Sequence, residues 1–141
     1  MRYLFMRQFT GHTCGPTTLR ICANAFLQKT LSGTTAKHLC KTTIDGTTWS
    51  NLKRPYKNAG LQIFDINKYT QKEWSAWLDS GYFIVTADED TYKNSHVIVV
   101  HKNHNNKKYG VLDPMIGLPT SRAKSYVIKS ARREAFAVCA A

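Results

Sequence analysis

The chain has 141 residues, 43% of them hydrophobic, and its 20 Lys and Arg residues against 9 Asp and Glu residues give a net charge of +11. This length predicts one domain over residues 1–141, with enough apolar residues for one hydrophobic core. The composition therefore excludes a two-domain enzyme and a disordered basic tail.

The sequence shows no signal for export or for membrane insertion. No apolar run approaches the ~20 residues that a membrane-spanning helix needs, and the apolar start of the chain is too short for a secretory signal. The cysteines include no Cys-x-x-Cys pair, so neither a zinc site nor a redox pair is predicted. We expect a cytoplasmic protein with reduced thiols and no metal or cofactor, and a viral or phage origin stays open.

The first half of the chain has the periodicity of helices. Apolar residues recur at i, i+3, i+4 and i+7 from Leu19 onward, which predicts a helix that begins at Cys14. Pro16 suits the first turn of this helix, and Thr13 is the expected N-cap. Three more helices are predicted over residues 34–40, from Trp49 to Gly60, and from the Thr70-x-x-Glu73 capping box to Gly81.

The second half has the periodicity of strands. Runs of β-branched and aromatic residues alternate with polar turns, which is typical of consecutive antiparallel strands. The fold class is therefore predicted as α+β, with an N-terminal helical half packed on a C-terminal antiparallel sheet. The expected strands cover residues 61–63, 82–87, 96–101, 109–112 and 134–140, with polar turns at 88–94 and 103–108, and residues 121–131 fit either helix or strand.

Cys14 is the first candidate for a chemical role. The partial positive charge at the start of a helix favours the thiolate, which is the nucleophilic form of cysteine. Gly15 has no side chain to obstruct a substrate carbonyl, and the Cys14 backbone N–H could donate to an oxyanion. The alternative is that Cys14 is a small buried apolar residue, the commonest environment of a cysteine.

A nucleophilic thiol needs a base, and the base needs a group that orients it. His96 begins one predicted strand and Asp113 ends the next, so an antiparallel pair would bring the two residues together. Gln8 lies shortly before Cys14 and could donate its side-chain N–H to an oxyanion. The alternative is that His96 and Asp113 are ordinary polar residues at strand ends.

The order of these residues resembles the C39-type cysteine peptidases of the papain-like group. The resemblance covers about residues 8 to 117: Gln8, then Cys-Gly-Pro-Thr before an apolar helix, then Ser-His96 before a valine-rich strand, and then Asp113-Pro. It also includes the segment from Asp-Gly-Thr-Thr-Trp at position 45 to residue 61. The resemblance implies a papain-like fold with Cys14 as nucleophile, His96 as general base and acid, Asp113 as orienting residue and Gln8 as oxyanion donor.

The resemblance also implies a protein or peptide substrate, such as a leader or precursor protein. Family members often cleave after a double glycine, and that preference is not carried over to this chain. Two alternatives stay open: acyl transfer or hydrolysis of a non-peptide amide by the same residues, and a catalytically silent basic binding module. The net charge of +11 would attract an acidic partner or non-specific nucleic acid. The sequence does not predict an oligomeric state.

Other polar residues have simpler interpretations. Residues 88–90, Asp-Glu-Asp, are expected in a solvated turn or at the border of the cleft, where they could contact basic substrate residues. His12 is expected at the rim of the site, and His101 and His104 in a solvated hairpin loop. The core is expected to contain Trp49, Trp74 and Trp77.

Overall fold

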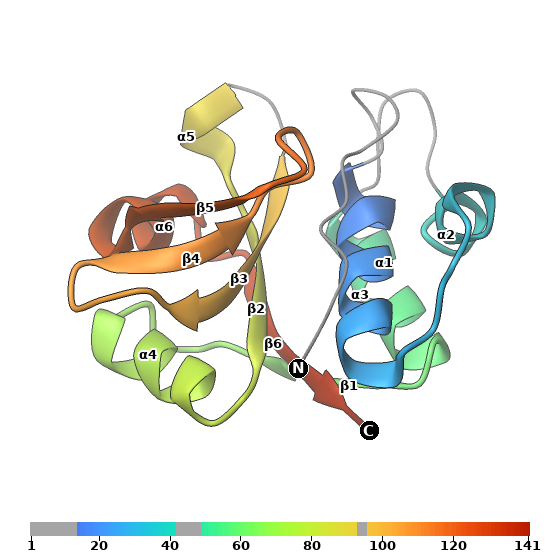
Figure 1. Cartoon of the computed structure of the whole chain (residues 1–141), viewed down its shortest axis with the longest axis horizontal. Helices are drawn as coiled ribbons and strands as arrows, with labels where there is room; N and C mark the ends of the chain where they lie inside the picture. Colours follow the sequence, from blue (N-terminus) through green and yellow to red (C-terminus); the bar gives the residue numbers. More distant parts are fainter. Residues whose placement is uncertain (1–13, 42–48, 93–95) are drawn as a thin grey trace.

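The computed structural model describes residues 14–41, 49–92 and 96–141, and these residues form six helices and six strands (Figure 1). The helices are α1 (Cys14–Leu27), α2 (Gly33–Leu39), α3 (Trp49–Asn58), α4 (Gln71–Asp79), α5 (Glu89–Tyr92) and α6 (Lys124–Ser130). The strands are β1 (Leu61–Asp65), β2 (Phe83–Ala87), β3 (Val97–Asn103), β4 (Lys108–Leu112), β5 (Pro119–Ala123) and β6 (Ala135–Ala140).

All six strands belong to one sheet, in the order β1-β6-β2-β3-β4-β5, and every neighbouring pair is antiparallel. Strands β2 to β5 follow one another as a meander, whereas β6 lies between β1 and β2. The predicted α+β class and antiparallel sheet are confirmed. None of the described helices is both long and apolar enough to cross a membrane.

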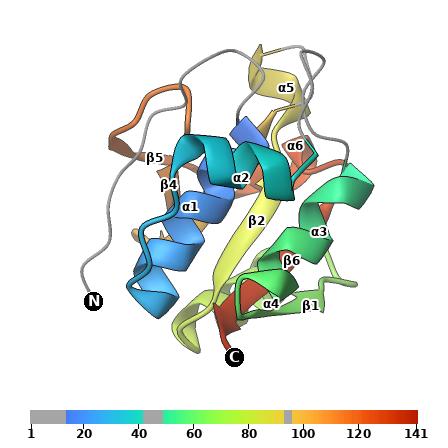
Figure 2. The same cartoon turned by 90° about the vertical axis from the view of Figure 1, so that its right-hand side faces the viewer.

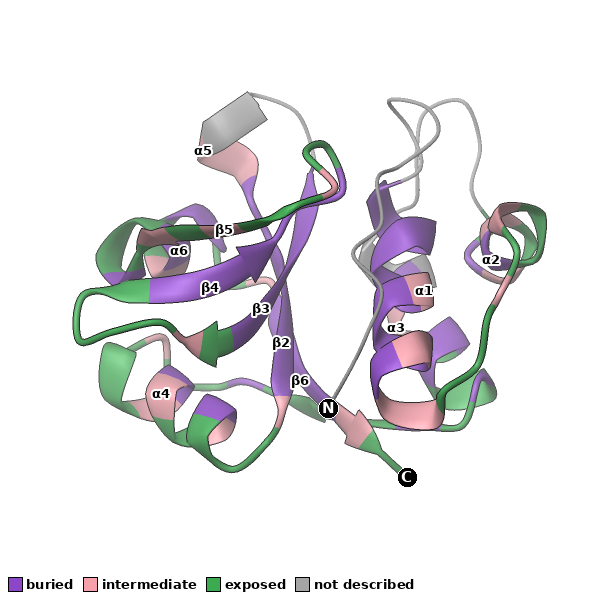
Figure 3. Cartoon of the chain, in the orientation of Figure 1, coloured by how far each residue is buried: buried purple, intermediate pink, exposed green. Residues whose placement is uncertain are grey.

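The sheet is covered on both faces (Figures 1 and 2). Helices α1 and α3 pack with Val85 and Val99 in one core, while α4 and α6 pack with Ile84 and Val100 in the other. The predicted helical half thus covers one face, and the predicted fourth helix crosses to the other. All residues of β2 and the first five residues of β3 are buried, and such strands need cover on both sides (Figure 3).

Helix α1 is described from Cys14 onward, and its first described turn is held by a chain of hydrogen bonds. Tyr56 of α3, which is fully buried, donates its hydroxyl to Thr18 Oγ1 at 2.7 Å, and Thr18 donates to the Gly15 carbonyl at 2.7 Å. Helix α3 therefore supports the turn that carries Cys14. The predicted N-cap, Thr13, lies outside the described residues.

Helix α4 begins as the capping box predicts, since Thr70 Oγ1 accepts a hydrogen bond from the Glu73 N–H at 3.2 Å. Trp74 is fully buried and stacks on Tyr109 with ring centroids 6.2 Å apart, which confirms its predicted place in the core. Trp77 is partly buried against the same core. The Trp49 side chain lies outside the described residues.

Strand β3 contains an irregularity that the sequence did not indicate. Its register with β4 shifts between Val100 and Lys102, which is typical of a β-bulge. The prediction that His101 is solvated is wrong: His101 is 8% exposed and its ring lies edge-on to Phe83, with centroids 6.1 Å apart. The physical reason is the alternation of the strand: His101 follows Val97 and Val99 at every second residue, and these two pack in the core that contains Phe83. His104 is exposed, as predicted.

Two further segments refine the sequence predictions. The ambiguous residues 121–131 contain the end of β5 and all of α6, so both interpretations hold in part. The polar residues 88–94 were predicted as a turn, and residues 89–92 form the short helix α5.

Candidate active site

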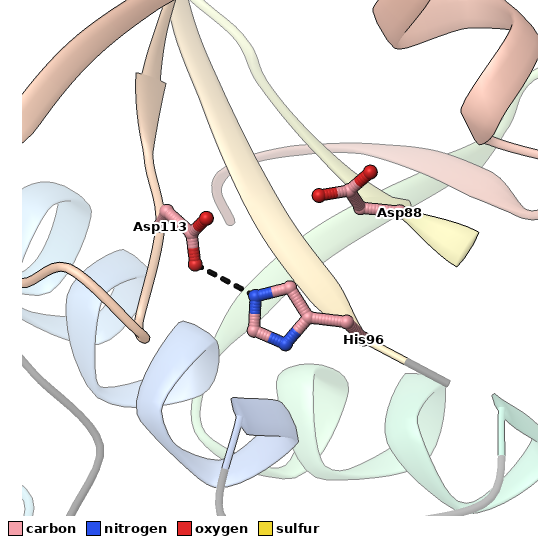
Figure 4. Close-up of side chains that lie close together, drawn as sticks. All are labelled: Asp88, His96 and Asp113. Carbon is pink, nitrogen blue, oxygen red and sulfur yellow. Dashed lines mark hydrogen bonds and ion pairs between the residues drawn. The ribbon is translucent and has the colours of Figure 1, made fainter. Parts of the chain in front are cut away.

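The ends of three neighbouring strands lie side by side at one end of the sheet. The registers pair Ala87 with Val97 and Val99 with Leu112, so the end of β2, the start of β3 and the end of β4 lie side by side. Asp88, His96 and Asp113 extend these strands by one residue each and come together there (Figure 4). The antiparallel register therefore makes the contact that the sequence suggested between His96 and Asp113.

His96 and Asp113 form a buried hydrogen-bonded pair. The distance from His96 Nε2 to Asp113 Oδ1 is 2.7 Å, and the two residues are 5% and 1% exposed. Asp113 Oδ1 also accepts the Met115 backbone N–H at 2.9 Å. The second nitrogen of the His96 ring points away from Asp113 (Figure 4).

The pair strongly favours its charged form. Burial alone lowers the pKa of His96, but hydrogen bonds to Asp113 and Cys14 outweigh it and raise that pKa to about 9. Burial alone raises the pKa of Asp113, but the hydrogen bond and charge of His96 outweigh it and lower that pKa to about 2. At neutral pH the site therefore holds an imidazolium beside a carboxylate.

Cys14 lies on the other side of the imidazole. It is 8% exposed at the start of α1, and its side chain forms a hydrogen bond with His96. Because Asp113 occupies Nε2, the ring nitrogen that faces the thiol is Nδ1. Cys14, His96 and Asp113 thus form a continuous chain of polar contacts. The fourth predicted site residue, Gln8, and the rim residue His12 lie outside the described residues.

The other three cysteines have different environments. Cys22 and Cys40 are fully buried, and burial raises the pKa of Cys40 to about 12 and that of Cys22 further. Cys139 is partly exposed on β6, and all four cysteines are free thiols. A thiol beside a histidine at a helix start is therefore a feature of Cys14 among the described cysteines.

Arg122 of β5 is a part of the site that the sequence prediction missed. Its Nη1 donates to Asp88 Oδ2 at 2.8 Å, and its Nη2 donates to Asp113 Oδ2. Arg122 stood in the segment that fitted either helix or strand, so no pattern indicated which way its side chain would point. The expectation of a solvated turn is wrong for Asp88, which is 1% exposed because the guanidinium binds it.

The same residues could be mistaken for a metal site. One ligand atom each of Asp88, His96 and Asp113 lie within 4.8 Å of one another. However, the Arg122 guanidinium already bridges the two carboxylates and supplies the positive charge between them. A metal ion would have to displace an arginine that is held in place by both carboxylates.

The comparison with protein families now identifies the chain. The model of the peptidase C39 family matches residues 2–126. This chain belongs to the peptidase C39 family. That family consists of cysteine peptidases, so the predicted resemblance is confirmed. The search of curated proteins found no match.

Solved structures of C39 domains have the same fold. The peptidase domain of Streptococcus ComA, a bifunctional ABC transporter involved in quorum sensing, is 22% identical with a TM-score of 0.81, over 99% of this chain and 100% of that one. A double glycine motif protease from an AMS/PCAT transporter, in complex with the leader peptide, is 16% identical with a TM-score of 0.72, over 98% and 90%. A C39-like peptidase from Bacillus anthracis is 12% identical with a TM-score of 0.69, over 100% and 99%.

Proposed function

We propose that this member of the C39 family is an active cysteine peptidase, with Cys14 as nucleophile, His96 as general base and acid, and Asp113 as the residue that orients His96. The observation that carries the proposal is the chain of contacts from the Cys14 thiol through His96 to Asp113, at the start of a helix. This arrangement suits a thiolate–imidazolium pair, because the helix start favours the anion and Asp113 favours the cation.

In the proposed reaction the Cys14 thiolate attacks the carbonyl carbon of the scissile peptide bond. The C–N bond then breaks as the His96 imidazolium gives its proton to the leaving amine, which produces a thioester with Cys14. Neutral His96 next takes a proton from water, whose oxygen attacks the thioester, and the acid product leaves. The thiolate and the imidazolium are thereby restored.

The oxyanion of each tetrahedral intermediate needs hydrogen-bond donors. We assign this role to the Cys14 backbone N–H, since N–H groups in the first turn of a helix have no acceptor within the helix, and to the Gln8 side chain. Gln8→Ala is expected to lower kcat by about 10²- to 10³-fold. A peptide hydrolysis assay on Gln8→Ala, with unchanged labelling of Cys14 as its control, measures this.

We further propose that the substrate is a leader or precursor peptide cut after a double glycine. The support is the fold shared with a double glycine motif protease that was solved with a leader peptide. The residues just after Asp113 include three exposed apolar side chains, Met115, Ile116 and Leu118, which are 39%, 39% and 64% exposed. Such a surface next to Asp113 in the chain suits apolar side chains of an extended peptide.

The experiment compares the wild-type chain with Cys14→Ala and Cys139→Ser on peptides that carry Gly-Gly or Ala-Ala at one site. Mass spectrometry of the products and labelling by a thiol-directed electrophile are the two readouts. We expect cleavage after Gly-Gly and labelling of one thiol, both lost in Cys14→Ala and retained in Cys139→Ser. Cleavage that persists in Cys14→Ala would contradict the assignment of the nucleophile.

Two other outcomes separate the alternatives. An acyl group found on an added amine, in place of a free carboxylate, would indicate acyl transfer by the same residues. A wild-type chain that neither cleaves nor reacts at Cys14 would favour a binding module. In that case the predicted attraction to an acidic partner or nucleic acid should weaken steeply as salt rises.

A further inference from the structure

Arg122 connects two buried carboxylates at the edge of the proposed active site. Its side chain is 15% exposed, and the side chains of Asp88 and Asp113 are 1% and 0% exposed. Nη1 binds Asp88 Oδ2 at 2.8 Å, while Nη2 binds Asp113 Oδ2. A guanidinium can bind two carboxylates in one plane, which a lysine ammonium cannot do with the same geometry.

The contacts of Asp113 divide its two oxygens between different partners. Oδ1 accepts from His96 Nε2 at 2.7 Å and from the Met115 N–H at 2.9 Å, while Oδ2 accepts from Arg122. Rotation of the carboxylate would break contacts on both oxygens. Arg122 therefore fixes the direction in which Asp113 presents Oδ1 to the imidazole.

Asp88 holds the Arg122 guanidinium in place. It binds the opposite end of the guanidinium, and its backbone N–H donates to the His96 carbonyl at 2.7 Å. Asp88 also contributes a negative charge that offsets Arg122. Without the negative charge of Asp88, the positive charge of Arg122 would disfavour the protonated form of His96.

We propose that Arg122 and Asp88 are positioning residues of the peptidase: Arg122 holds the Asp113 carboxylate toward His96, and Asp88 holds the guanidinium and balances its charge. The proposal rests on the proposed function of Cys14, His96 and Asp113. The effect of Arg122 and Asp88 passes through Asp113 to His96.

The charged and titratable groups that face Asp113 come from four elements. His96 precedes β3, Arg122 belongs to β5, Asp88 follows β2, and Cys14 begins α1 and faces His96. Removal of the positive charge of Arg122 should raise the pKa of its neighbours, and removal of the negative charge of Asp88 should lower it. These opposite signs distinguish charge positioning from a general loss of structure.

The test measures kcat and KM for peptide cleavage and the rate of Cys14 alkylation, both as a function of pH, in full-length variants. Arg122→Met should lower kcat by about 10²-fold with little change in KM, because a misplaced base costs rate more than binding. It should also shift the acid limbs of the two pH profiles, for cleavage and for Cys14 alkylation, to higher pH by about one unit. Asp88→Asn should shift these limbs to lower pH.

Two variants sharpen this test. The double variant Arg122→Met/Asp88→Asn should return the acid limb to its wild-type position while the rate stays low, since charge balance is restored and the orientation is not. Arg122→Lys keeps the charge and should keep the limb in place with an intermediate rate. Arg132→Met is the matched control, because it removes an arginine bound to an aspartate, Asp90, at 2.5 Å on the surface.

The outcomes are separable. If wild type and Arg132→Met are active and Arg122→Met loses less than about twofold in kcat with no pH shift, the positioning proposal is wrong while the peptidase stands. Limbs that move in the same direction in Arg122→Met and Asp88→Asn would also overturn it. A wild-type chain without cleavage or Cys14 alkylation defeats the proposed function instead. If Arg122→Met does not fold, Asp88→Asn still decides the sign of the shift, and Arg122→Lys still decides the effect on the rate.

Discussion

Two buried histidines lie immediately before strand β3 and near its far end, and they differ in charge state. His96 at the start is 5% exposed with a pKa raised to about 9, whereas His101 at the bulge is 8% exposed with a pKa lowered to about 4. Burial lowers the pKa in both places. The difference is Asp113, which hydrogen-bonds His96, while the nearby charge at His101 is that of Lys102.

This comparison shows what distinguishes the two buried histidines of this fold. Burial alone favours a neutral imidazole, as at His101, and at His96 the hydrogen bonds with Asp113 and Cys14 reverse that effect. A strand can therefore carry two histidines of similar exposure, one suited to acid–base chemistry and one that behaves as a core residue.

The largest expected effect comes from replacing Asp113, whose hydrogen bond with His96 has no counterpart at His101. Asp113→Asn should lower kcat by about 10⁴-fold, because an amide can hold the imidazole in the wrong tautomer and does not stabilise its charge. The pKa of His96 should fall toward the low value of His101. A peptide cleavage assay and a titration of the histidine ring signals by NMR measure both effects. If the pKa of His96 stays near 9 in Asp113→Asn, Asp113 is not the cause of the difference between the two histidines.

The next largest effect concerns stability: the contributions of His101 and His96 to the free energy of unfolding should depend on pH with opposite signs. The folded pKa of His101, about 4, lies below the ordinary value of 6.5, so its contribution is present above that value and is lost as pH falls toward 4. We expect a loss of about 1–2 kcal/mol over this range, after allowance for solvent screening. Urea unfolding of wild type and His101→Gln measures it, with the exposed His104→Gln as control.

His96 should show the reverse sign. Its folded pKa, about 9, lies above 6.5, so its contribution to the free energy of unfolding is fully present below 6.5 and is lost as pH rises through 9. The difference in urea midpoint between wild type and His96→Gln should therefore shrink as the solution becomes alkaline. A difference that grows with pH would contradict the assigned charge state.

An effect on stability alone is expected at the bulge. A Cβ on Gly110 would lie 2.8 Å from Lys102 Cγ and 2.9 Å from His101 Nε2, closer than side-chain carbons approach. Gly110→Ala should therefore cost about 1–3 kcal/mol of stability. Thermal unfolding measures this loss. Cleavage per folded molecule should stay unchanged, because the bulge lies at the other end of β3 from His96.

Sequence reasoning located the parts of the site that depend on local patterns. The helix start at Cys14 followed from apolar periodicity and Pro16, and the contact between His96 and Asp113 followed from the lengths of two consecutive strands. Both rest on interactions between residues near in the chain. The catalytic roles of these residues stay predictions.

The missed parts depend on how distant elements pack. Arg122 belongs to β5 and binds Asp88, which follows β2, although β3 and β4 lie between these strands in the sheet, and the segment that carries Arg122 was not distinguishable from a helix. Asp88 looked solvated because it begins a run of three acidic residues. His101 continues the inward alternation of Val97 and Val99, and its contact with Phe83 becomes visible only once β2 and β3 are paired.

The position of β6 has a consequence for the order in which the protein can assemble. Residues 135–140 fill the place between β1 and β2, so the sheet stays in two separate pieces until they are available. During synthesis on the ribosome, β2 to β5 and the site residues at their ends emerge before the strand that joins them to β1. The two apolar cores should therefore close late, and the nascent chain should gain peptidase activity only after residue 140 has left the exit tunnel.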